Sequence, residues 1–390
     1  MKKGWEVKRL GDLSRVIAGQ SPQGSFYNTD GFGMPFYQGK KNFSERLIGS
    51  PNTWTTQVTK VAQPGDILMS VRAPVGPVNL TDREICIGRG LAAIRNGRNL
   101  NRDFLFYQLR FLEPSISGRD GAVFPSINKS EVESLQIVTP PLPEQHRIVR
   151  ILDEAFESIA KAKANAEKNL QNARELFESH LNQVFTQRGE GWVEMSLNQA
   201  TNGIFTGPFG SLLHKSDYIE NGIPLVNPAH ITEVGIVPDL CKTVSKETAS
   251  RLGNYIMHDG DIVIGRRGEM GRCALVTAVE DGWLCGTGSF VIKPSSLCDA
   301  RYLVRFLRSE GCKARLEKIA NGTVMPNLSN TELGNLFLDL PPFDCQKTIV
   351  QEIDDLHKET QCLAQLYERK VAALESLKMS LLYKAFNGTQ

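Results

Sequence analysis

PPLPEQHRIV, at residues 140–149, and PPFDCQKTIV, at residues 341–350, are two versions of one segment, 201 residues apart. Residues 121–185 align with residues 322–386 without a gap, and 16 of the 65 positions are identical. The identical pairs include Gly121/Gly322, Pro125/Pro326, Pro140/Pro341, Gln145/Gln346, Asp153/Asp354 and Phe185/Phe386. Self-similarity over such a length indicates a duplicated structural unit, here of about 190 residues.

The similarity continues upstream of the two junctions. PGDILMSVRAPVG (64–76) parallels DGDIVIGRRGEMG (259–271), NRDFLFYQLR (101–110) parallels DARYLVRFLR (299–308), and GWEVKRL (4–10) parallels GWVEMSL (191–197). The offset changes between these matches, so the gaps fall in loops while the helical parts keep their length. We therefore predict four consecutive parts, which are a head (1–142), a long helix (143–187), a second head (188–342) and a second long helix (343–390).

The segment after each junction has the spacing of a long amphipathic helix, with apolar or small residues three or four positions apart. In the first helix they are Ile148, Leu152, Ala155, Ile159, Ala162, Ala166, Leu170, Ala173, Phe177, Leu181 and Val184. In the second they are Ile349, Ile353, Leu356, Leu363, Tyr367, Val371, Leu374, Leu377 and Leu381. Pro143 and Glu144 suit a first turn, Asp344 is expected to be an N-cap, and Gly189 and Gly388 lie just past the predicted ends.

The two predicted helices are expected to pack against each other in antiparallel orientation. Each has about 43 residues and spans on the order of 65 Å, and so long an amphipathic rod must bury its apolar seam. Residues 191–340 connect the end of the first helix to the start of the second. One compact head can do so easily only if those two ends lie together. We expect two heads held apart by a helical coiled-coil spacer.

The heads have a different sequence texture. Short apolar runs such as GDILMSV (65–71) and EICIGRG (84–90) are bounded by Gly, Pro, Asn and Asp, which is typical of strands and turns. RDFLFYQLRFL (102–112) and ARYLVRFLRSE (300–310) have helical spacing. The predicted fold class is α+β, with two mixed α/β heads joined by two long antiparallel helices in a pseudo-two-fold internal repeat.

Composition points to an ordinary cytosolic protein. Hydrophobic residues make up 41% and charged residues 23% of the 390 residues, and the net charge is only +2. No apolar run approaches the length of a membrane span, and the first residues lack the apolar core of a secretory signal. The eight cysteines form no CxxC pair, so free, mostly buried thiols are expected. We predict a cytoplasmic location without membrane association.

Positive charge gathers in head 1, and arginines recur at a matching turn of head 2. Residues 1–142 contain 18 Lys and Arg against 12 Asp and Glu, and eight arginines but no lysine fall between Arg72 and Arg119. Arg266 and Arg267 follow the strand that matches the one before Arg72. Guanidinium groups suit phosphates and the O6/N7 edge of guanine. These arginines are either ordinary surface charges, some paired with Glu84, Asp103 or Glu113, or nucleic-acid contacts, and the matched position in both copies favours the second interpretation.

Familiar catalytic motifs are missing. GMPFYQGKK (33–41) does not have the spacing of a phosphate-binding loop, and GRGLAA (88–93) fits a strand-edge turn better than a dinucleotide-binding loop. No HExxH, GxSxG or N-P-P-[YF] sequence occurs. The sequence predicts a chain that recognises and does not catalyse.

The duplicated layout, the PPLPEQHRIV junction, the GW start of each head and the paired GDILMS and GDIVIG turns resemble the specificity subunit of type I restriction–modification systems. The resemblance covers residues 4–388, although FDCQ (343–346) and NQA (198–200) depart from LPEQ (142–145) and GDL (11–13). It implies that each head is a target recognition domain for one half of a split, asymmetric site in double-stranded DNA. It also implies that the helices set the spacer and dock two modification (methyltransferase) subunits, which restriction subunits join.

The resemblance also implies which residues contact DNA, since polar loops around the central strands face DNA in the family. The candidates are Ser21, Gln38, Lys40, Lys41, Asn42, Arg72 and Arg89 in head 1, and Ser211, Lys215, Asn227, His230, Arg266 and Arg267 in head 2. The lysines are expected at phosphates, and Gln38, Arg72, Asn227 and Arg267 at base edges. No catalytic, cofactor or metal site is predicted in this chain, and S-adenosylmethionine, ATP and Mg²⁺ would belong to partner subunits.

Two alternatives stay open at this point. One is a specificity chain that serves a fused methyltransferase–nuclease, as in type IIB-like systems. The other is a two-headed coiled-coil scaffold that binds proteins, which a salt-sensitive interaction with DNA would argue against.

Overall fold

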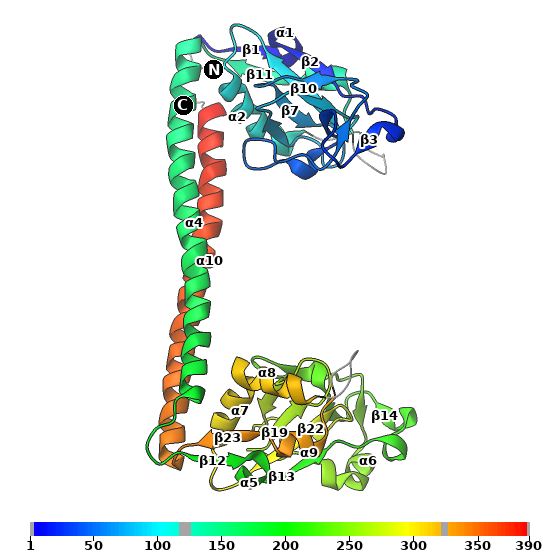
Figure 1. Cartoon of the computed structure of the whole chain (residues 1–390), viewed down its shortest axis with the longest axis vertical. Coiled ribbons are helices and arrows are strands. Elements are labelled where there is room, and N and C mark those ends of the chain that lie inside the picture. Colours follow the sequence, from blue (N-terminus) through cyan, green and yellow to red (C-terminus); the bar gives the residue numbers. More distant parts are fainter. Residues whose placement is uncertain (1–3, 117–125, 321–326, 388–390) are drawn as a thin grey trace. The chain divides into compact units, whose positions relative to one another are not determined.

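The computed structural model describes residues 4–116, 126–320 and 327–387. The chain divides into two units, of which unit 1 comprises residues 1–167 with 368–390 and unit 2 comprises residues 168–367. Each unit therefore contains one head together with part of both long helices (Figure 1). The glycine at 388 and the arginine at 119 lie outside the described residues.

Head 1 is built on two small sheets. One has the strand order β2–β10–β7–β8, and the other has the order β3–β5–β4–β9–β6 with β4 and β9 parallel. The strands are β2 (Ser14–Ala18), β3 (Tyr27–Asn28), β4 (Met34–Tyr37), β5 (Trp54–Thr55), β6 (Val61–Ala62), β7 (Ile67–Ser70), β8 (Val78–Leu80), β9 (Ile85–Ile87) and β10 (Leu91–Asn96). A separate pair, β1 (Glu6–Arg9) with β11 (Gln136–Thr139), closes the head before the long helix. The helices are α1 (Leu10–Leu13), α2 (Arg102–Leu112) and α3 (Lys129–Glu133).

Head 2 repeats this plan. Its first sheet has the order β13–β22–β19–β20 and its second the order β14–β18–β15–β21, with β15 and β21 parallel. The strands are β12 (Val193–Ser196), β13 (Thr201–Thr206), β14 (Tyr218–Ile219), β15 (Ile223–Val226), β16 (Ile231–Thr232), β17 (Gly235–Ile236), β18 (Thr243–Val244), β19 (Ile262–Gly265), β20 (Cys273–Leu275), β21 (Leu284–Cys285), β22 (Ser289–Pro294) and β23 (Phe337–Leu340). The helices are α5 (Leu197–Ala200), α6 (Lys246–Arg251), α7 (Ala300–Arg308), α8 (Glu310–Ile319) and α9 (Asn330–Gly334). The predicted mixed α/β heads and internal repeat are confirmed.

The central strands are apolar on both faces because each face covers a different core. Side chains alternate along a strand, so Ile67 and Met69 of β7 pack with α2 and the long helix, whereas Leu68 packs with the second sheet. In β19 the same alternation places Ile262 and Ile264 in one core and Val263 in another. The GDILMS and GDIVIG runs therefore read as continuous apolar segments.

The long helices are α4 (Leu142–Thr186) and α10 (Phe343–Phe386), of 45 and 44 residues. Within unit 1 they run antiparallel, because Lys163 pairs with Glu375 while Phe156, seven residues earlier, lies under the ammonium of Lys378 at 5.3 Å. The antiparallel prediction is confirmed there. Asp344 is not an N-cap, since α10 begins one residue before it, but its carboxylate lies in the first turn, where the helix dipole favours negative charge.

Two positions of the predicted seam are wrong. Leu363 and Leu377 are 40% and 46% exposed, while the buried or half-buried positions of α10 run through Ile353, Thr360, Val371 and Leu374. A heptad-like apolar pattern drifts around the surface of a straight helix. Which of its positions are buried therefore depends on where the partner helix packs and not only on where the leucines lie.

The repeated glutamine of the two junctions is a buried clamp between head and helix. Gln145 Oε1 accepts the N–H of Asn101 at 2.7 Å, and its Nε2 donates to Pro140 O at 2.8 Å and Asn99 O at 3.3 Å. In unit 2, Gln346 binds Asp299 N, Pro341 O and Leu297 O at 2.7, 2.8 and 2.8 Å. Both glutamines are fully buried. Each amide joins the loop before the head helix to the start of a long helix.

The repeated aspartate is a second link, made with different partners in the two units. Asp153 of α4 accepts a hydrogen bond from Arg46 at 2.8 Å and one from the hydroxyl of Tyr107. Asp354 of α10 pairs with Arg305, which occupies on α7 the place of Tyr107 on α2. The acid is kept while the donor has changed.

In the described parts of the chain, none of the helices is both long enough and apolar enough to cross a membrane. All eight cysteines are free, and Cys86, Cys273, Cys285, Cys298 and Cys312 are buried. The expectation of free and mostly buried thiols is thus confirmed.

Candidate nucleic-acid interface

In head 1, four strand ends meet around the turn Gly88–Gly90. After β2, Gln20 N–H donates to Ile87 O at 2.9 Å, and after β4 the carbonyl of Gln38 accepts the N–H of Gly90 at 3.1 Å. Val71, directly after β7, donates to the carbonyl of Gly90 at 3.0 Å. The turn therefore gathers Ser21, Gln38, Arg72 and Arg89, four of the candidate contact residues of head 1, at one place.

The glycines of this turn are there for close contact. A Cβ on Gly90 would lie 2.3 Å from Gln38 O, and a Cβ on Gly88 would lie 3.1 Å from both Gln38 Cα and Ser21 Oγ. The hydroxyl of Ser21 accepts the backbone N–H of Arg89 at 3.2 Å. The strand β10 follows at once, so GRGLAA is a strand-edge turn and not a dinucleotide-binding loop.

Lys40, Lys41 and Asn42 form a short 3-10 helix just after Gln38. Both lysines are exposed. Asn42 has structural work, because its Nδ2 donates to Ser50 O at 2.8 Å and its carbonyl accepts the N–H of Gly49 at 2.8 Å. Lys40 and Lys41 are therefore available for contact with a ligand, whereas Asn42 mainly stabilises the loop through its own hydrogen bonds.

Head 2 repeats the turn with other side chains. Gly286 N–H donates to Val226 O at 2.9 Å, and Arg266 N–H donates to Gly288 O at 2.9 Å, as Val71 does to Gly90 in head 1. A Cβ on Gly286 would lie 2.3 Å from Asn227 Oδ1. Asn227, Arg266 and Arg267 thus gather around residues 286–288. Arg267, not Arg266, occupies the place of Arg72, since each forms the equivalent bridge, with Asn327 and Ser126 respectively.

The other candidates of head 2 are less well placed. His230 Nδ1 lies 2.9 Å from Leu225 O and 3.3 Å from Asn227 N, so this nitrogen holds the turn after β15 and only the other ring nitrogen is left for a ligand. Lys215 is exposed in a short 3-10 helix that precedes β14 of the second sheet. Ser211 lies in the 3-10 helix Gly210–Leu212, and its side chain is outside what the structure describes.

Several arginines of head 1 pair with nearby carboxylates. Arg95 holds Asp66 with two bonds of 2.8 and 2.7 Å, Arg83 pairs with its neighbour Asp82 at 2.7 Å, and Arg102 pairs with Asp103 at 2.9 Å. The interpretation as ordinary charges is correct for these three. Arg72 and Arg89, which the strand-end turn positions, are both exposed.

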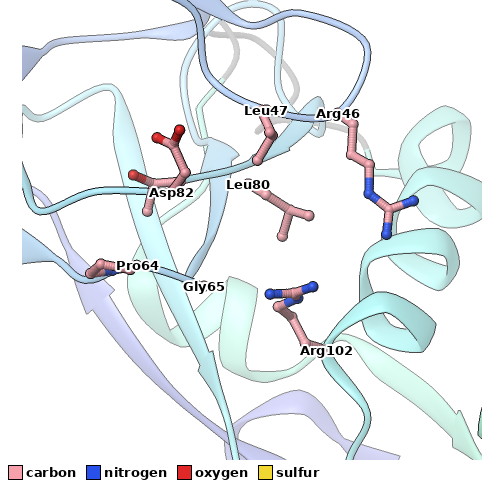
Figure 2. A pocket seen from close by; sticks show the side chains of 8 residues that line it. Arg46, Leu47, Pro64, Gly65, Leu80, Asp82 and Arg102 are labelled. Atoms are coloured by element: carbon pink, nitrogen blue, oxygen red, sulfur yellow. The ribbon is translucent and has the colours of Figure 1, made fainter.

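Unit 1 contains a cavity of about 440 Å³. Figure 2 shows that the guanidinium groups of Arg46 and Arg102 point into it. Both groups are already paired, since Arg46 binds Asp103 and Asp153 at 2.9 and 2.8 Å and Arg102 binds Asp103. Asp82, which also lines the cavity, is paired with Arg83. With its arginines neutralised, the cavity is not an anion site, and among the described residues no cluster suitable for a metal ion was found.

Asn327 was missed by sequence reasoning. Its Oδ1 accepts from Nε of both Arg266 and Arg267, at 3.2 and 3.4 Å. The internal repeat could have pointed to Asn327, because Asn327 aligns with Ser126 at the same 201-residue offset as the two junctions. Phe209, two residues after the close contact of Gly207 with Gly286, is 61% exposed near the same turn.

Two segments of the chain, residues 2–169 and 192–369, match the family model described as the type I restriction modification DNA specificity domain. The chain belongs to this family. The family model thus matches twice, and each matched segment includes one of the two strand-end turns. The resemblance noted from the sequence is confirmed.

Two relatives from Methanocaldococcus jannaschii support this membership. A chain named as the MjaX specificity subunit of a type I restriction enzyme is 43% identical over 171 residues, which are 42% of this chain and 40% of that relative. The MjaVIII specificity subunit of a type I restriction enzyme is 22% identical over 98% of this chain and 92% of its own length. Against this relative the similarity is low but extends over nearly the whole length.

Among solved structures, a chain from work on the structural basis of complex assembly and conformational transition of the type I R-M system has a TM-score of 0.78. It is 20% identical, and the match covers 99% of this chain and 98% of that one. At this identity the likeness shows the fold, which is the duplicated head and long-helix plan.

Proposed function

We propose that this family member is the DNA-recognition subunit of a type I restriction–modification complex and that each head reads one half of a split, asymmetric target. Head 1 lies within residues 1–142 and head 2 within 188–342. The observation that carries the proposal is the strand-end turn, in which several backbone hydrogen bonds recur in both heads while the side chains differ. Gln38 and Arg72 in head 1 stand where Asn227 and Arg267 stand in head 2. A repeated frame with diverged polar groups suits a target with two different halves.

The roles of the side chains follow from their chemistry. Gln38, Arg72, Asn227 and Arg267 are assigned to base edges, because amides and guanidinium forks make paired hydrogen bonds in the major groove. Lys40, Lys41 and Lys215 are assigned to phosphates, which carry affinity but little sequence information. Ser21, Asn42, Arg89, Ser211, His230 and Arg266 complete the proposed contact set.

The long helices, within 143–187 and 343–390, are assigned to the spacer and to docking of two modification subunits. Exposed apolar side chains close together on them support docking, since contiguous exposed apolar patches mark interaction sites. They include Leu363 and Leu366 in unit 2 and Leu377, Met379 and Tyr383 in unit 1. Methyl transfer and cleavage are assigned to the modification and restriction subunits, which would bring S-adenosylmethionine, ATP and Mg²⁺.

The test is adenine-methylation mapping of a genome that carries this gene with its modification partner. We expect one split motif that vanishes when the gene is deleted and whose halves follow the heads when heads are exchanged between relatives. Unchanged methylation would favour the two-headed scaffold instead.

A single substitution tests the base-reading role. Arg267→Ala is expected to weaken binding of the mapped target by about tenfold, because a bidentate arginine–guanine contact contributes about 1–3 kcal/mol. DNA with a scrambled head-2 half-site should be bound with unchanged affinity. Equal weakening on both DNAs would assign Arg267 to a phosphate.

A further inference from the structure

Two arginines and one asparagine form a cluster in head 2. Arg266 and Arg267 follow β19, and Asn327 lies just before α9. The backbone holds the two segments together, because Arg267 and Asn327 form a β-bridge and Leu328 N–H donates to Arg266 O at 2.9 Å. Asn327 Oδ1 then accepts Nε–H of Arg266 at 3.2 Å and of Arg267 at 3.4 Å. One amide oxygen therefore orients two guanidinium groups.

This bonding determines which edge of each guanidinium is left for a ligand. A guanidinium has five N–H donors in a rigid plane, and occupying Nε–H leaves the two terminal nitrogens as a parallel pair. Such a pair matches two acceptors side by side, as guanine presents with O6 and N7 in the major groove. Because Arg267 is exposed, its terminal nitrogens are the ones that can reach a base.

The cluster also carries two like charges close together. Arg266 is half-buried, and its guanidinium carbon lies 5.3 Å from the centre of the Phe290 ring. Burial and, to a smaller extent, the neighbouring charge of Arg267 lower the pKa of Arg266. A ligand with two hydrogen-bond acceptors offsets both the burial of the Arg266 charge and its repulsion from Arg267. The arrangement is therefore more suited to a bound than to an empty state.

Head 1 supplies the contrast. There Val71 makes the backbone bonds that Arg266 makes in head 2, and Ser126 forms the bridge with Arg72 that Asn327 forms with Arg267. A serine at that place lacks the reach of an asparagine amide. The orienting amide is a feature of head 2, although both heads hold these two segments together with the same backbone hydrogen bond and the same bridge.

We propose that Asn327 is a specificity-determining positioning residue, which presents the fork of Arg267 to a guanine in the head-2 half-site. This rests on the proposed function, because it requires that head 2 reads DNA. It goes further in naming the base, the edge of the base that is read, and a residue that acts without touching DNA itself.

The experiment uses the whole chain assembled with its modification subunits and the target mapped by methylation. Binding is measured to the target, to the target with 7-deazaguanine at each guanine of the head-2 half-site, and to DNA with that half scrambled. Asn327→Ser gives head 2 the residue of head 1, Asn327→Asp keeps an acceptor but draws the arginines into ion pairs, and Ser126→Ala is the matched control in head 1. Thermal unfolding of each variant reports on the fold.

We expect Asn327→Ser and Asn327→Asp to weaken target binding by about tenfold while binding to scrambled DNA changes less than twofold. One 7-deazaguanine should weaken the wild type and not the variants, and Ser126→Ala should leave head-2 discrimination unchanged. Equal weakening on target and scrambled DNA would overturn the proposal in favour of a phosphate contact, and unchanged discrimination would overturn it outright. If the wild type does not distinguish target from scrambled DNA, the proposed function itself fails.

Discussion

Replacing the junction glutamine of unit 2 gives the most direct test of how head and helix are joined. Gln346 makes three hydrogen bonds of 2.7–2.8 Å in a fully buried position. Each buried hydrogen bond contributes on the order of 1 kcal/mol net, so Gln346→Met, which keeps the volume, is expected to destabilise unit 2 by about 3 kcal/mol. For a unit of this size that corresponds to a fall in Tm of about 6–12 °C.

The assay is urea unfolding followed by hydrogen exchange, which separates the two units. Gln346→Met should lower protection in residues 168–367, and Gln145→Met should do the same in residues 1–167, with a smaller effect because one of its bonds is 3.3 Å long. Gln351→Met on the exposed face of α10 is the control and should cost less than 0.5 kcal/mol. If Gln346→Met lowers the free energy of unfolding of unit 2 by less than about 1 kcal/mol, Gln346 does not stabilise the junction between head 2 and α10 as argued.

Three further predictions concern thiols, pH and close packing. A thiol reagent should modify only Cys241, Cys345 and Cys362 in the folded chain, because the other five cysteines are buried. Burial also raises the pKa of Cys273 to about 11 and that of Cys312 to about 12. Mass spectrometry that finds any of the five buried cysteines modified before unfolding would contradict this expectation. The hydrogen bond from Lys378 lowers the pKa of Glu45 in the folded chain, so the unfolded chain binds more protons and unit 1 should lose stability as pH falls below about 4.5. Lys378→Met should make the free energy of unfolding, measured by urea titration, depend less on pH. An unchanged pH dependence would exclude the Lys378–Glu45 pair as its source. Gly286→Ala would place a Cβ 2.3 Å from Asn227 Oδ1 and should abolish discrimination at the head-2 half-site, whereas Gly253→Ala, which meets nothing within 4 Å, should leave DNA binding unchanged.

The duplicated plan could be predicted from the sequence because its signals are local. Apolar residues three or four apart define a long helix whatever surrounds it, and Gln145 and Gln346 stand out because both copies keep them. Which leucines of α10 are buried could not be predicted, since Leu363 and Leu377 fit the period but lie off the face that the structure covers.

The surroundings of the candidate contact residues could be predicted less completely, because they depend on pairing between distant segments. Arg95 and Asp66 are 29 residues apart and Arg266 and Asn327 are 61 apart, and no spacing rule joins such partners. Gln38, Arg72 and Asn227 were chosen by residue type and loop position, and the structure places them beside the strand-end turns. Lys215 was chosen in the same way and lies in a 3-10 helix before β14. The contact of these residues with DNA stays a prediction.

Unit 1 is made of both ends of the chain, and this has a consequence for synthesis on the ribosome. Leu382 and Phe386 of α10 are buried in the core of unit 1, where Phe386 packs against Phe104 and Phe111 of α2. At about 5–20 residues per second, these side chains are made roughly 10 to 45 s after residue 167. The head that is translated first is therefore the last to be completed, and until then an aromatic surface on α2 is open to solvent, to chaperones or to other nascent chains.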